Sequence, residues 1–332
     1  MSQGSHQRGS RQEGSTPPGK TTRSADSPPR EANPKWGTSD WSIGQSAALA
    51  CLMESMAPKA GNVHRGVDFV DTTFYDFLVS SMAIEKTFDC SRELTLGQLI
   101  RQAVAATAEL VGTNTNLGII LLLAPLAQCR PHPDPESIRQ VLDQSTAEDC
   151  RDLYAAIAIA QPGGLGKTEV ADAKQDAPPA DMSLVEAMSL ASDRDSIARE
   201  YATYFDTFFQ TVLPIVDSAI HELDSLPDAI VHAHLDILSR IPDTLIARKC
   251  GVDLANSCSA RAARIVDGWA PGTAGYLQQL EEFDFWLRSD EHRRNPGTSA
   301  DYVAAALFTL LRTGRLPAEK IRAMLASARR QK

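Results

Sequence analysis

The feature that most constrains this chain is a helical spacing of apolar residues that recurs from Trp41 almost to the C-terminus. Runs such as SIGQSAALACLMESM and LTLGQLIRQAVAATAEL place apolar side chains three and four residues apart, as one face of an amphipathic helix requires. No run alternates apolar and polar residues in the manner of a half-buried strand. The sequence therefore predicts an all-α fold, with residues 39–332 forming a single compact multi-helix domain.

The first 38 residues have a different composition. They are rich in Ser, Gly, Pro, Arg and Gln and hold almost no aliphatic side chains, so they bury too little apolar surface to offset the entropy of ordering. We expect a disordered N-terminal tail over residues 1–38. The tail lacks the apolar core of a secretory signal, and the most apolar run of the chain, 117–127, is too short to span a bilayer. These features predict a cytoplasmic protein without membrane contact.

The formal net charge of −9 argues against a nucleic-acid partner, because binding a phosphate backbone needs a basic face. A small anionic substrate bound together with Mg²⁺ stays compatible with this charge, since such metal sites themselves require carboxylates. The sequence does not predict an oligomeric state.

The stretch QPGGLGKT (161–168) ends like a nucleotide-binding P-loop. The motif needs Gly at the position held by Gln161, and it follows a buried strand, whereas the residues before this stretch are typical of a helix. It is therefore not a P-loop. Its glycines and Lys167 still suit anion binding, so Gly164 and Lys167 are candidate phosphate contacts, with a plain connector as the alternative.

A second polar loop, PKAGNVHRGVDF, concentrates five candidate residues around two glycines: Lys59, Asn62, His64, Arg65 and Asp68. Lysine and arginine suit phosphate oxygens, aspartate suits Mg²⁺, and histidine can carry a proton near neutral pH. A solvated connector is the alternative interpretation.

Three further segments place polar residues at expected helix starts. ELVGTNTNLG carries Glu109, Asn114 and Asn116 ahead of an apolar helix, which is more than one N-cap needs. IPDTLIARKCG carries Asp243, which we expect to be an N-cap. The third segment, NPGTSAD, contributes Asn295, Ser299 and Asp301. Helix N-termini favour anions, so these segments are candidates for ligand contacts.

Taken in order, ESMAPKAGNVHRGVDF, ELVGTNTNLGIILLLAPLA, GGLGKTE, RDSIAREY, IPDTLIARKCG and NPGTSADYVAAALF resemble triphosphoribosyl-dephospho-CoA synthase over about residues 45–315. The resemblance implies an all-helical, Mg²⁺-dependent transferase in which the 2′-hydroxyl of dephospho-CoA attacks C1 of the ribose of ATP and adenine leaves. The chain departs from the family pattern at Asn116 and Leu117, where the family carries basic residues, which indicates a divergent branch and leaves the acceptor open.

For this chemistry we expect carboxylates to hold Mg²⁺ and to stabilise the charge that develops on the ribose. The expected metal ligands are Glu54, Asp68 and Glu109, with Asp243 and Asp301 as outer candidates. The expected catalytic residues are Glu109, His64 and Asp68, with either Glu109 or His64 as general base. The expected substrate- and phosphate-binding residues are Lys59, Asn62, Arg65, Asn114, Asn116, Gly164, Lys167, Asn295 and Ser299.

Three other functions stay open at this point. Pentosyl transfer could serve the biosynthesis of a pterin-type one-carbon cofactor instead of a dephospho-CoA derivative. An N-ribosyl glycohydrolase would use the same carboxylates with water as the acceptor. A helical interaction module without catalysis would leave the glycine-rich polar loops without a role.

Overall fold

The computed structural model of the chain describes residues 41–161 and 179–330. Its first half contains α1 (Ile43–Met56), α2 (Phe74–Ala83), α3 (Glu85–Asp89), α4 (Leu96–Leu110), α5 (Leu117–Gln128), α6 (Pro135–Asp143) and α7 (Ala147–Ala160). The second half contains α9 (Leu184–Ser189), α10 (Ser196–Ala202), the π-helix η2 (Phe208–Val212), α11 (Leu213–Glu222), α12 (Leu226–Arg240), α13 (Thr244–Cys250), α14 (Val252–Gly268), α15 (Ala274–Arg288), α16 (Gly297–Arg312) and α17 (Ala318–Arg330).

The prediction of an all-α fold is confirmed, because the described residues contain helices and no β-strand. One isolated antiparallel bridge, between His64 and Val67, closes the loop before α2. The described residues form one compact unit, and the predicted tail lies outside them. No helix of the described ranges is both long and apolar enough to cross a membrane.

Local sequence explains where many helices begin. Ser183 and Glu186 form the capping box of α9, and Pro135 occupies the first position of α6. Thr95 and Thr146 start α4 and α7 with capping boxes of their own. Each box satisfies backbone N–H groups that the first helical turn leaves without partners.

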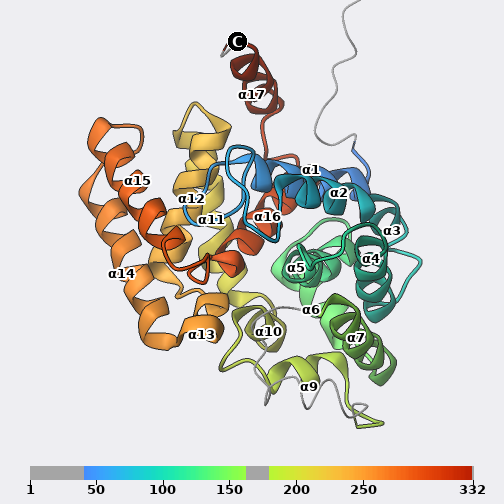
Figure 1. The fold of residues 1–332 in the computed structure, drawn as a ribbon. Helices are drawn as coiled ribbons and strands as arrows, with labels where there is room; N and C mark the ends of the chain where they lie inside the picture. The colour runs from blue at the N-terminus through green and yellow to red at the C-terminus, as the bar shows by residue number, and fades with distance from the viewer. Residues whose placement is uncertain (1–40, 162–178, 331–332) are drawn as a thin grey trace, which may run out of the picture. The chain divides into compact units, whose positions relative to one another are not determined.

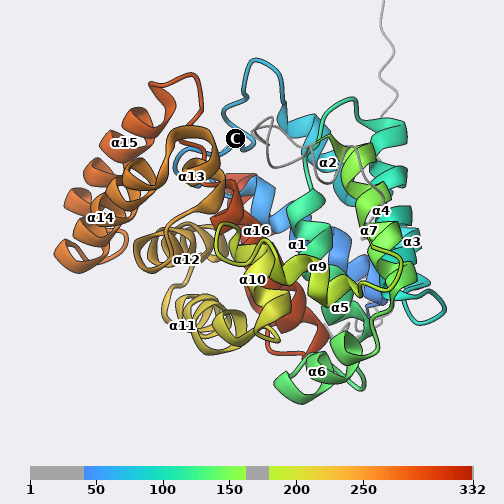
Figure 2. The ribbon, with the colours of Figure 1, turned by 90° about the horizontal axis from the view of Figure 1, so that it is seen from below.

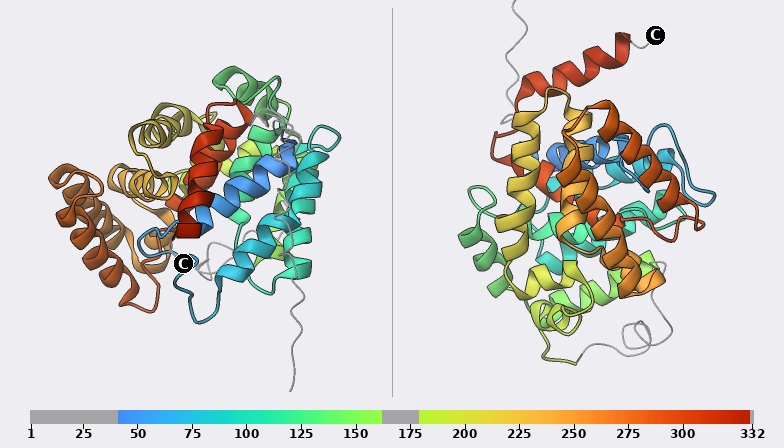
Figure 3. Two further views of the ribbon diagram at one scale, coloured as in Figure 1. Left: turned by 90° about the horizontal axis from the view of Figure 1, so that it is seen from above. Right: turned by 90° about the vertical axis from the view of Figure 1, so that its left-hand side faces the viewer.

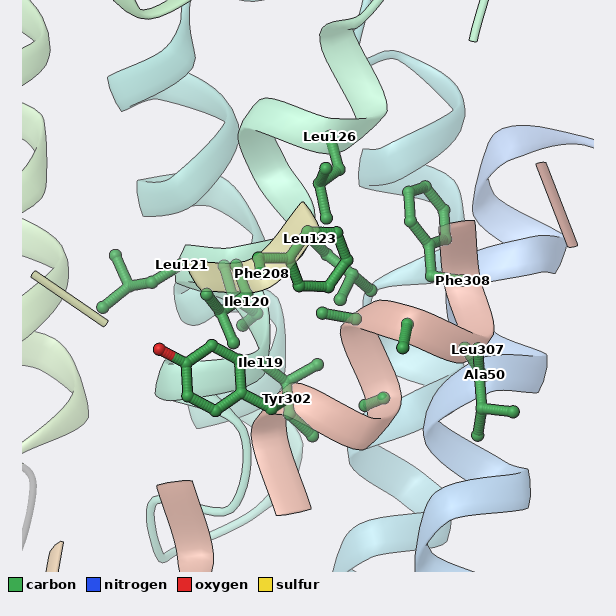
Figure 4. Packing of buried hydrophobic residues seen from close by; sticks show 14 of the residues in the cluster. Ala50, Ile119, Ile120, Leu121, Leu123, Leu126, Phe208, Tyr302, Leu307 and Phe308 are labelled. Atoms are coloured by element: carbon green, nitrogen blue, oxygen red, sulfur yellow. The ribbon is translucent and has the colours of Figure 1, made fainter. Parts of the chain in front are cut away.

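The core is built around α5 and α16. In α5 the run LGIILLLAPLA is apolar on every side, and a helix of that kind is stable only when other helices surround it. Figure 4 shows Ile120 and Leu123 of α5 in one cluster with Phe208, Leu307 and Phe308. Helix α16 packs in turn along α1, and Figure 3 shows these two helices side by side.

The other helices are arranged on either side of α5 and α16. Helices α13, α14 and α15 lie on one side, while α2, α3, α4 and α7 lie on the other (Figures 1 and 2). The two groups of helices therefore flank α5 and α16, and the candidate site lies at the N-terminal ends of these two helices.

The segment 194–223 has helical spacing throughout, but the structure breaks it. Helix α10 ends at Ala202, and Tyr204 and Phe205 take φ angles of 55° and 62°, which no helix continues through. The buried carboxylate of Glu200 accepts a hydrogen bond from Phe208 N at 3.1 Å, so it holds the start of η2 after the break. Apolar periodicity alone does not reveal such a break, because both parts bury apolar faces.

Candidate active site

A cavity of about 620 Å³ opens at the N-terminal ends of α5, α10, α13 and α16. Its volume lies in the range of small-molecule sites, roughly 300–1,000 Å³. The polar part of its wall consists of Glu54, Asn62, Asp71, Thr72, Thr113, Asn114, Thr115, Asn116, Tyr154, Gln161, Arg194, Asp195, Arg248, Lys249, Glu291, His292, Asn295, Thr298 and Asp301. The remaining wall, contributed mainly by α5, α7, α9 and α10, is largely apolar.

Helix α5 presents its N-terminus to this cavity. Asn116 is its N-cap residue, and the side-chain oxygen of Asn114 accepts a hydrogen bond from Leu117 N at 3.1 Å. Leu117 and Gly118 of the first turn line the cavity. Because the first turn of a helix carries free N–H groups and partial positive charge, this end of the cavity favours a bound anion.

Asp301, in the second turn of α16, lies against the start of α5. A Cβ atom at Gly118 would lie 2.0 Å from Asp301 Oδ2, so only glycine leaves room for this carboxylate. Burial raises the pKa of Asp301 well above its usual range, and the negative charges of Glu54, Asp243 and Asp195 raise it further. The carboxylate is thus held in a site that a nearby positive charge would stabilise.

Asp195 joins α10 to α13. Its Oδ1 accepts hydrogen bonds from Ile197 N at 2.9 Å and Ala198 N at 3.1 Å, which makes it the N-cap of α10. Its Oδ2 lies 2.7 Å from Nη1 of Arg248, on α13. This ion pair, at the cavity wall, fixes the guanidinium of Arg248 in place.

A second aspartate, Asp243, lies behind the wall. It is the N-cap of α13, as predicted, and its Oδ2 accepts hydrogen bonds from Ser299 N at 2.8 Å and Ser299 Oγ at 2.9 Å. Asp243 and Ser299 are both buried, so their contact ties the start of α13 to the start of α16. A chain of hydroxyls from Ser196 through Thr244 to Thr298 adds α10 to the same junction.

Lys59 also lies inside the protein. Its side chain is fully buried, and its Nζ is 2.8 Å from Oε1 of Glu54, which lines the cavity. The same Nζ donates to the backbone carbonyl of Glu54. Close by, burial and the charge of Lys59 lower the pKa of His234 to about 3, so this buried imidazole is neutral.

The loop after Lys59 is anchored to α15. Gly61 N donates to Asp284 Oδ1 at 2.7 Å, and Arg288 Nη2 donates to the backbone carbonyl of Asn62 at 2.6 Å. Asn62 Nδ2 donates to Asn295 Oδ1 at 2.8 Å, so two predicted residues from distant segments meet in the cavity wall.

An aromatic pair stands at another part of the wall. The rings of Phe69 and His292 stack with their centroids 4.1 Å apart. Burial, followed by the charge of Arg288, lowers the pKa of His292, so its imidazole is neutral near pH 7. The stack leaves Nδ1 of this imidazole buried without a hydrogen-bond partner among the described residues.

A sequence model of the ATP:dephospho-CoA triphosphoribosyl transferase family matches residues 40–319, and so spans every element of the cavity. The chain belongs to the ATP:dephospho-CoA triphosphoribosyl transferase family. This confirms the resemblance seen in the sequence, and the chain is a transferase by its family.

The fold of this transferase is also found in a crystal structure from Archaeoglobus fulgidus, of a protein with a provisional description as triphosphoribosyl-dephospho-CoA synthase. The two are 23% identical with a TM-score of 0.54, and the match covers 72% of this chain and 98% of the other. No curated protein matches the sequence.

Three polar atoms in the wall of the transferase cavity are buried and lack a hydrogen-bond partner among the described residues: Asn62 Oδ1, Arg248 Nε and His292 Nδ1. Such orphaned groups are costly and rare in folded proteins. Gln161, Glu291 and His292, also in the wall, have positive φ angles of 42°, 50° and 60°. Unpaired polar atoms and unfavourable backbone angles around one cavity are typical of a ligand site.

The structure brings part of the predicted site together. Of the predicted residues, the cavity wall contains Glu54, Asn62, Asn114, Asn116, Asn295 and Asp301. Lys59, Asp243 and Ser299 lie buried behind it. Gly164 and Lys167 lie outside the described residues.

Four predicted residues lie apart from the cavity wall. Asp68 is exposed and accepts a hydrogen bond from Phe74 N at 2.7 Å, a contact that orders the entry to α2. His64 accepts from Gly66 N within its own turn, and Arg65 beside it is exposed. Glu109 is exposed near the C-terminal end of α4. Their predicted catalytic, metal and phosphate roles stay predictions, without support from this geometry.

Five residues that line the cavity were not predicted from the sequence: Arg194, Asp195, Arg248, Lys249 and His292. The segments RDSIAREY and IPDTLIARKCG contain four of them, so the resemblance of these two segments to the family was the available signal. His292 had no such signal, because only the turn at Glu291 and His292 directs it to the cavity.

Within the described residues, no group of three or more His, Cys, Asp and Glu side chains is arranged to hold a metal ion. The five predicted metal ligands are not assembled in one place, since Asp68 and Glu109 lie away from Glu54 and Asp301. Mg²⁺ commonly needs only one or two protein carboxylates, because water and substrate phosphates complete its shell. The pair Glu54 and Asp301 fits that smaller requirement.

Proposed function

We propose that this chain transfers the triphosphoribosyl group of ATP to the 2′-hydroxyl of dephospho-CoA, or of a related cofactor precursor, with release of adenine. The observation that carries the proposal is a single cavity in which a helix N-terminus and three cationic side chains face a carboxylate whose pKa is strongly raised. Membership of the family supports the type of reaction.

The cationic side chains of the wall suit the triphosphate. Arg248 is oriented by its ion pair with Asp195 and keeps a free Nε, while Arg194 and Lys249 lie in the adjoining wall. Burial and the neighbouring charge of Arg248 lower the pKa of Lys249. A bound anion would raise this pKa again and favour the charged form of Lys249. A guanidinium can donate two parallel hydrogen bonds to two oxygens of a phosphate, and the N-terminus of α5 adds backbone N–H groups.

Mg²⁺ would be held by Asp301 and Glu54. The charges of Glu54, Asp243 and Asp195 all raise the pKa of Asp301, and a divalent cation would remove this repulsion. When bound, Mg²⁺ would neutralise charge on the triphosphate and orient it.

In the transfer, the bond between C1 of the ribose and the purine nitrogen breaks, and a bond forms from C1 to the acceptor oxygen. The acceptor hydroxyl loses its proton, and adenine leaves with the electron pair of the broken bond and takes up a proton from water. His292 is the residue we assign as proton acceptor, since it is neutral near pH 7 and its Nδ1 is free at the cavity wall. The positive charge that develops on the ribose is stabilised by the carboxylates beside it.

The test is incubation with ATP and Mg²⁺, with and without dephospho-CoA, followed by measurement of free adenine and of the mass of the acceptor. Adenine release that requires the acceptor, with addition of a triphosphoribosyl group to it, is the expected result. Adenine released without acceptor would instead identify a glycohydrolase. Transfer to a pterin-type precursor but not to dephospho-CoA would retain the reaction and change the acceptor.

Substitutions test whether the transfer activity depends on residues of the first cavity. Asp301→Asn should abolish most transfer, whereas Asp253→Asn, an exposed carboxylate near the start of α14, should not change it. Glu109→Gln decides between the sequence prediction and the geometry: a loss as large as that of Asp301→Asn would show that Glu109 acts in catalysis despite its exposed position.

A further inference from the structure

A second cavity, of about 470 Å³, lies between the starts of α4 and α7, with α6 beside it. It includes Gln128, the last residue of α5, whereas the first cavity includes Leu117, at the beginning of the same helix. At 1.5 Å per residue, the 12 residues of α5 separate the two by about 18 Å. The proposed transfer does not use this second cavity.

Arginines without partners characterise its wall. Arg92 and Arg130 line it, and neither forms an ion pair or a hydrogen bond with another described residue. Arg312 lies nearby: burial lowers its pKa and the charge of Arg92 lowers it further, while its Nε is buried without a partner in the described part of the chain. Arg92 and Arg130 are exposed, so water screens their charges, and an anion bound between them would be attracted by both.

The carboxylate of the wall does not supply that anion. Asp149 is buried, and its Oδ1 accepts from Gly97 N at 2.8 Å. Its Oδ2 accepts from Thr146 N at 2.8 Å and Thr146 Oγ1 at 2.7 Å. Asp149 therefore caps α7 and joins it to α4, with both oxygens already engaged.

Hydrogen-bond donors complete the wall. Ser91 is fully buried, it lines the cavity, and its Oγ has no hydrogen-bond partner among the described residues. Ser145, Gln144 and Gln140 place further hydroxyl and amide groups around the same space. A buried hydroxyl without a partner is costly, and an oxyanion is a ligand that would accept a hydrogen bond from it.

We propose that this second cavity binds a small oxyanion, a phosphate ester or a carboxylate, through Arg92, Arg130 and the hydroxyl of Ser91. Arginine presents paired N–H groups that match the oxygens of either anion. The cavity volume admits a ligand of metabolite size, which suits a regulatory site separate from the reaction.

The test is calorimetric titration of the full chain with inorganic phosphate and, separately, with succinate, at constant ionic strength. In Arg92→Gln/Arg130→Gln the dissociation constant should rise at least about tenfold, the effect of losing one or more charge-assisted contacts. Arg101→Gln is the matched control, because Arg101 lies on α4, pairs with Asp152 and does not line the cavity. Its affinity should equal that of the wild type.

Two single variants protect the test against a folding defect. Gln144→Glu adds a negative charge at an exposed position of the wall and should weaken binding without disturbing the core. Ser91→Ala should weaken binding while leaving stability equal or higher, since the lost hydroxyl has no partner in the protein. If phosphate binds in the first cavity instead, its binding should be lost in Arg248→Gln and should persist in Arg92→Gln/Arg130→Gln.

Binding of either anion that disappears in the double variant supports the proposal, and the preferred anion identifies phosphate or carboxylate as the ligand class. Equal affinity in the wild type and the double variant would overturn it. So would the absence of binding of both anions to the wild type at millimolar concentrations.

Discussion

Gly118 and Asp301, almost 200 positions apart in the chain, are in such close contact that a single added methyl group would collide with the carboxylate. Both Oδ2 and Cγ of Asp301 would lie within 2.7 Å of a Cβ at position 118. The start of α5 and the second turn of α16 are thus fitted to each other at the cavity, and the fit depends on the missing side chain.

Gly118→Ala should therefore impair both stability and transfer. We expect a destabilisation of about 1–3 kcal/mol, as for other overpacked sites, together with a large loss of turnover because Asp301 is displaced. Gly112→Ala is the control, since a Cβ there meets no atom within 4 Å. Urea unfolding and adenine release measure the two effects; a fully active Gly118→Ala would show that the position of Asp301 is unimportant.

Lys59→Met tests whether Lys59 supports the fold or contacts a phosphate. Removing the lysine leaves Glu54 buried and unpaired, which should cost about 3–5 kcal/mol of stability. The double variant Lys59→Met/Glu54→Gln should recover part of this loss, and Lys86→Met, at an exposed position of α3, should cause none. Thermal unfolding gives the answer. A variant of normal stability with weakened ATP binding would favour the phosphate contact predicted from the sequence.

Glu200 should make stability depend on pH. Burial raises its pKa from 4.5 to about 7, although Tyr302 and Phe208 donate hydrogen bonds to it. Because the folded pKa exceeds the unfolded one, its contribution is complete below pH 4.5 and is lost as pH rises to about 7. The shift corresponds to about 3 kcal/mol.

Glu200→Gln removes this titration, so the variant should gain stability relative to the wild type as pH rises from 5 to 8. Urea unfolding at the two pH values measures the change. Glu281→Gln, an exposed position of α15, should show no such trend. A constant difference between Glu200→Gln and the wild type at both pH values would contradict the raised pKa.

His292→Phe keeps an aromatic ring to stack on Phe69 but removes the proposed proton acceptor. In the wild type, kcat/KM should rise with pH and level off below the ordinary histidine pKa of 6.5, since the pKa of His292 is lowered. The variant should lose about 10²- to 10⁴-fold in kcat, the usual contribution of a general base, and lose the acidic limb of the profile. An unchanged pH profile would exclude His292 as the base.

The all-α fold was predictable because apolar spacing, capping boxes and prolines agreed with one another along the chain. Asp243 at the start of α13 and Pro135 at the start of α6 are local signals that the structure confirms. The break after Ala202 was not predictable, since it depends on Glu200 receiving hydrogen bonds from residues beyond the break and from Tyr302.

The site was predictable only in part. Asn114 and Asp301 belong to polar segments at helix starts, Asn62 belongs to the polar loop after α1, and all three line the cavity. Lys59 has the residue type of a phosphate ligand, yet its partner Glu54 draws it into the interior. The sequence shows which residues could bind, whereas burial and ion pairing decide which of them face the cavity.

The packing of α1 along α16 has a consequence for how this protein is made. The first cavity takes Glu54 from the beginning of the described chain and Asp301 from near its end, so a ribosome must release almost the whole polypeptide before this cavity exists. A ligand that bridges these two helices stabilises only the completed protein, and its binding free energy adds to that of the entire fold. Occupancy by the nucleotide would then report that synthesis and folding have both finished.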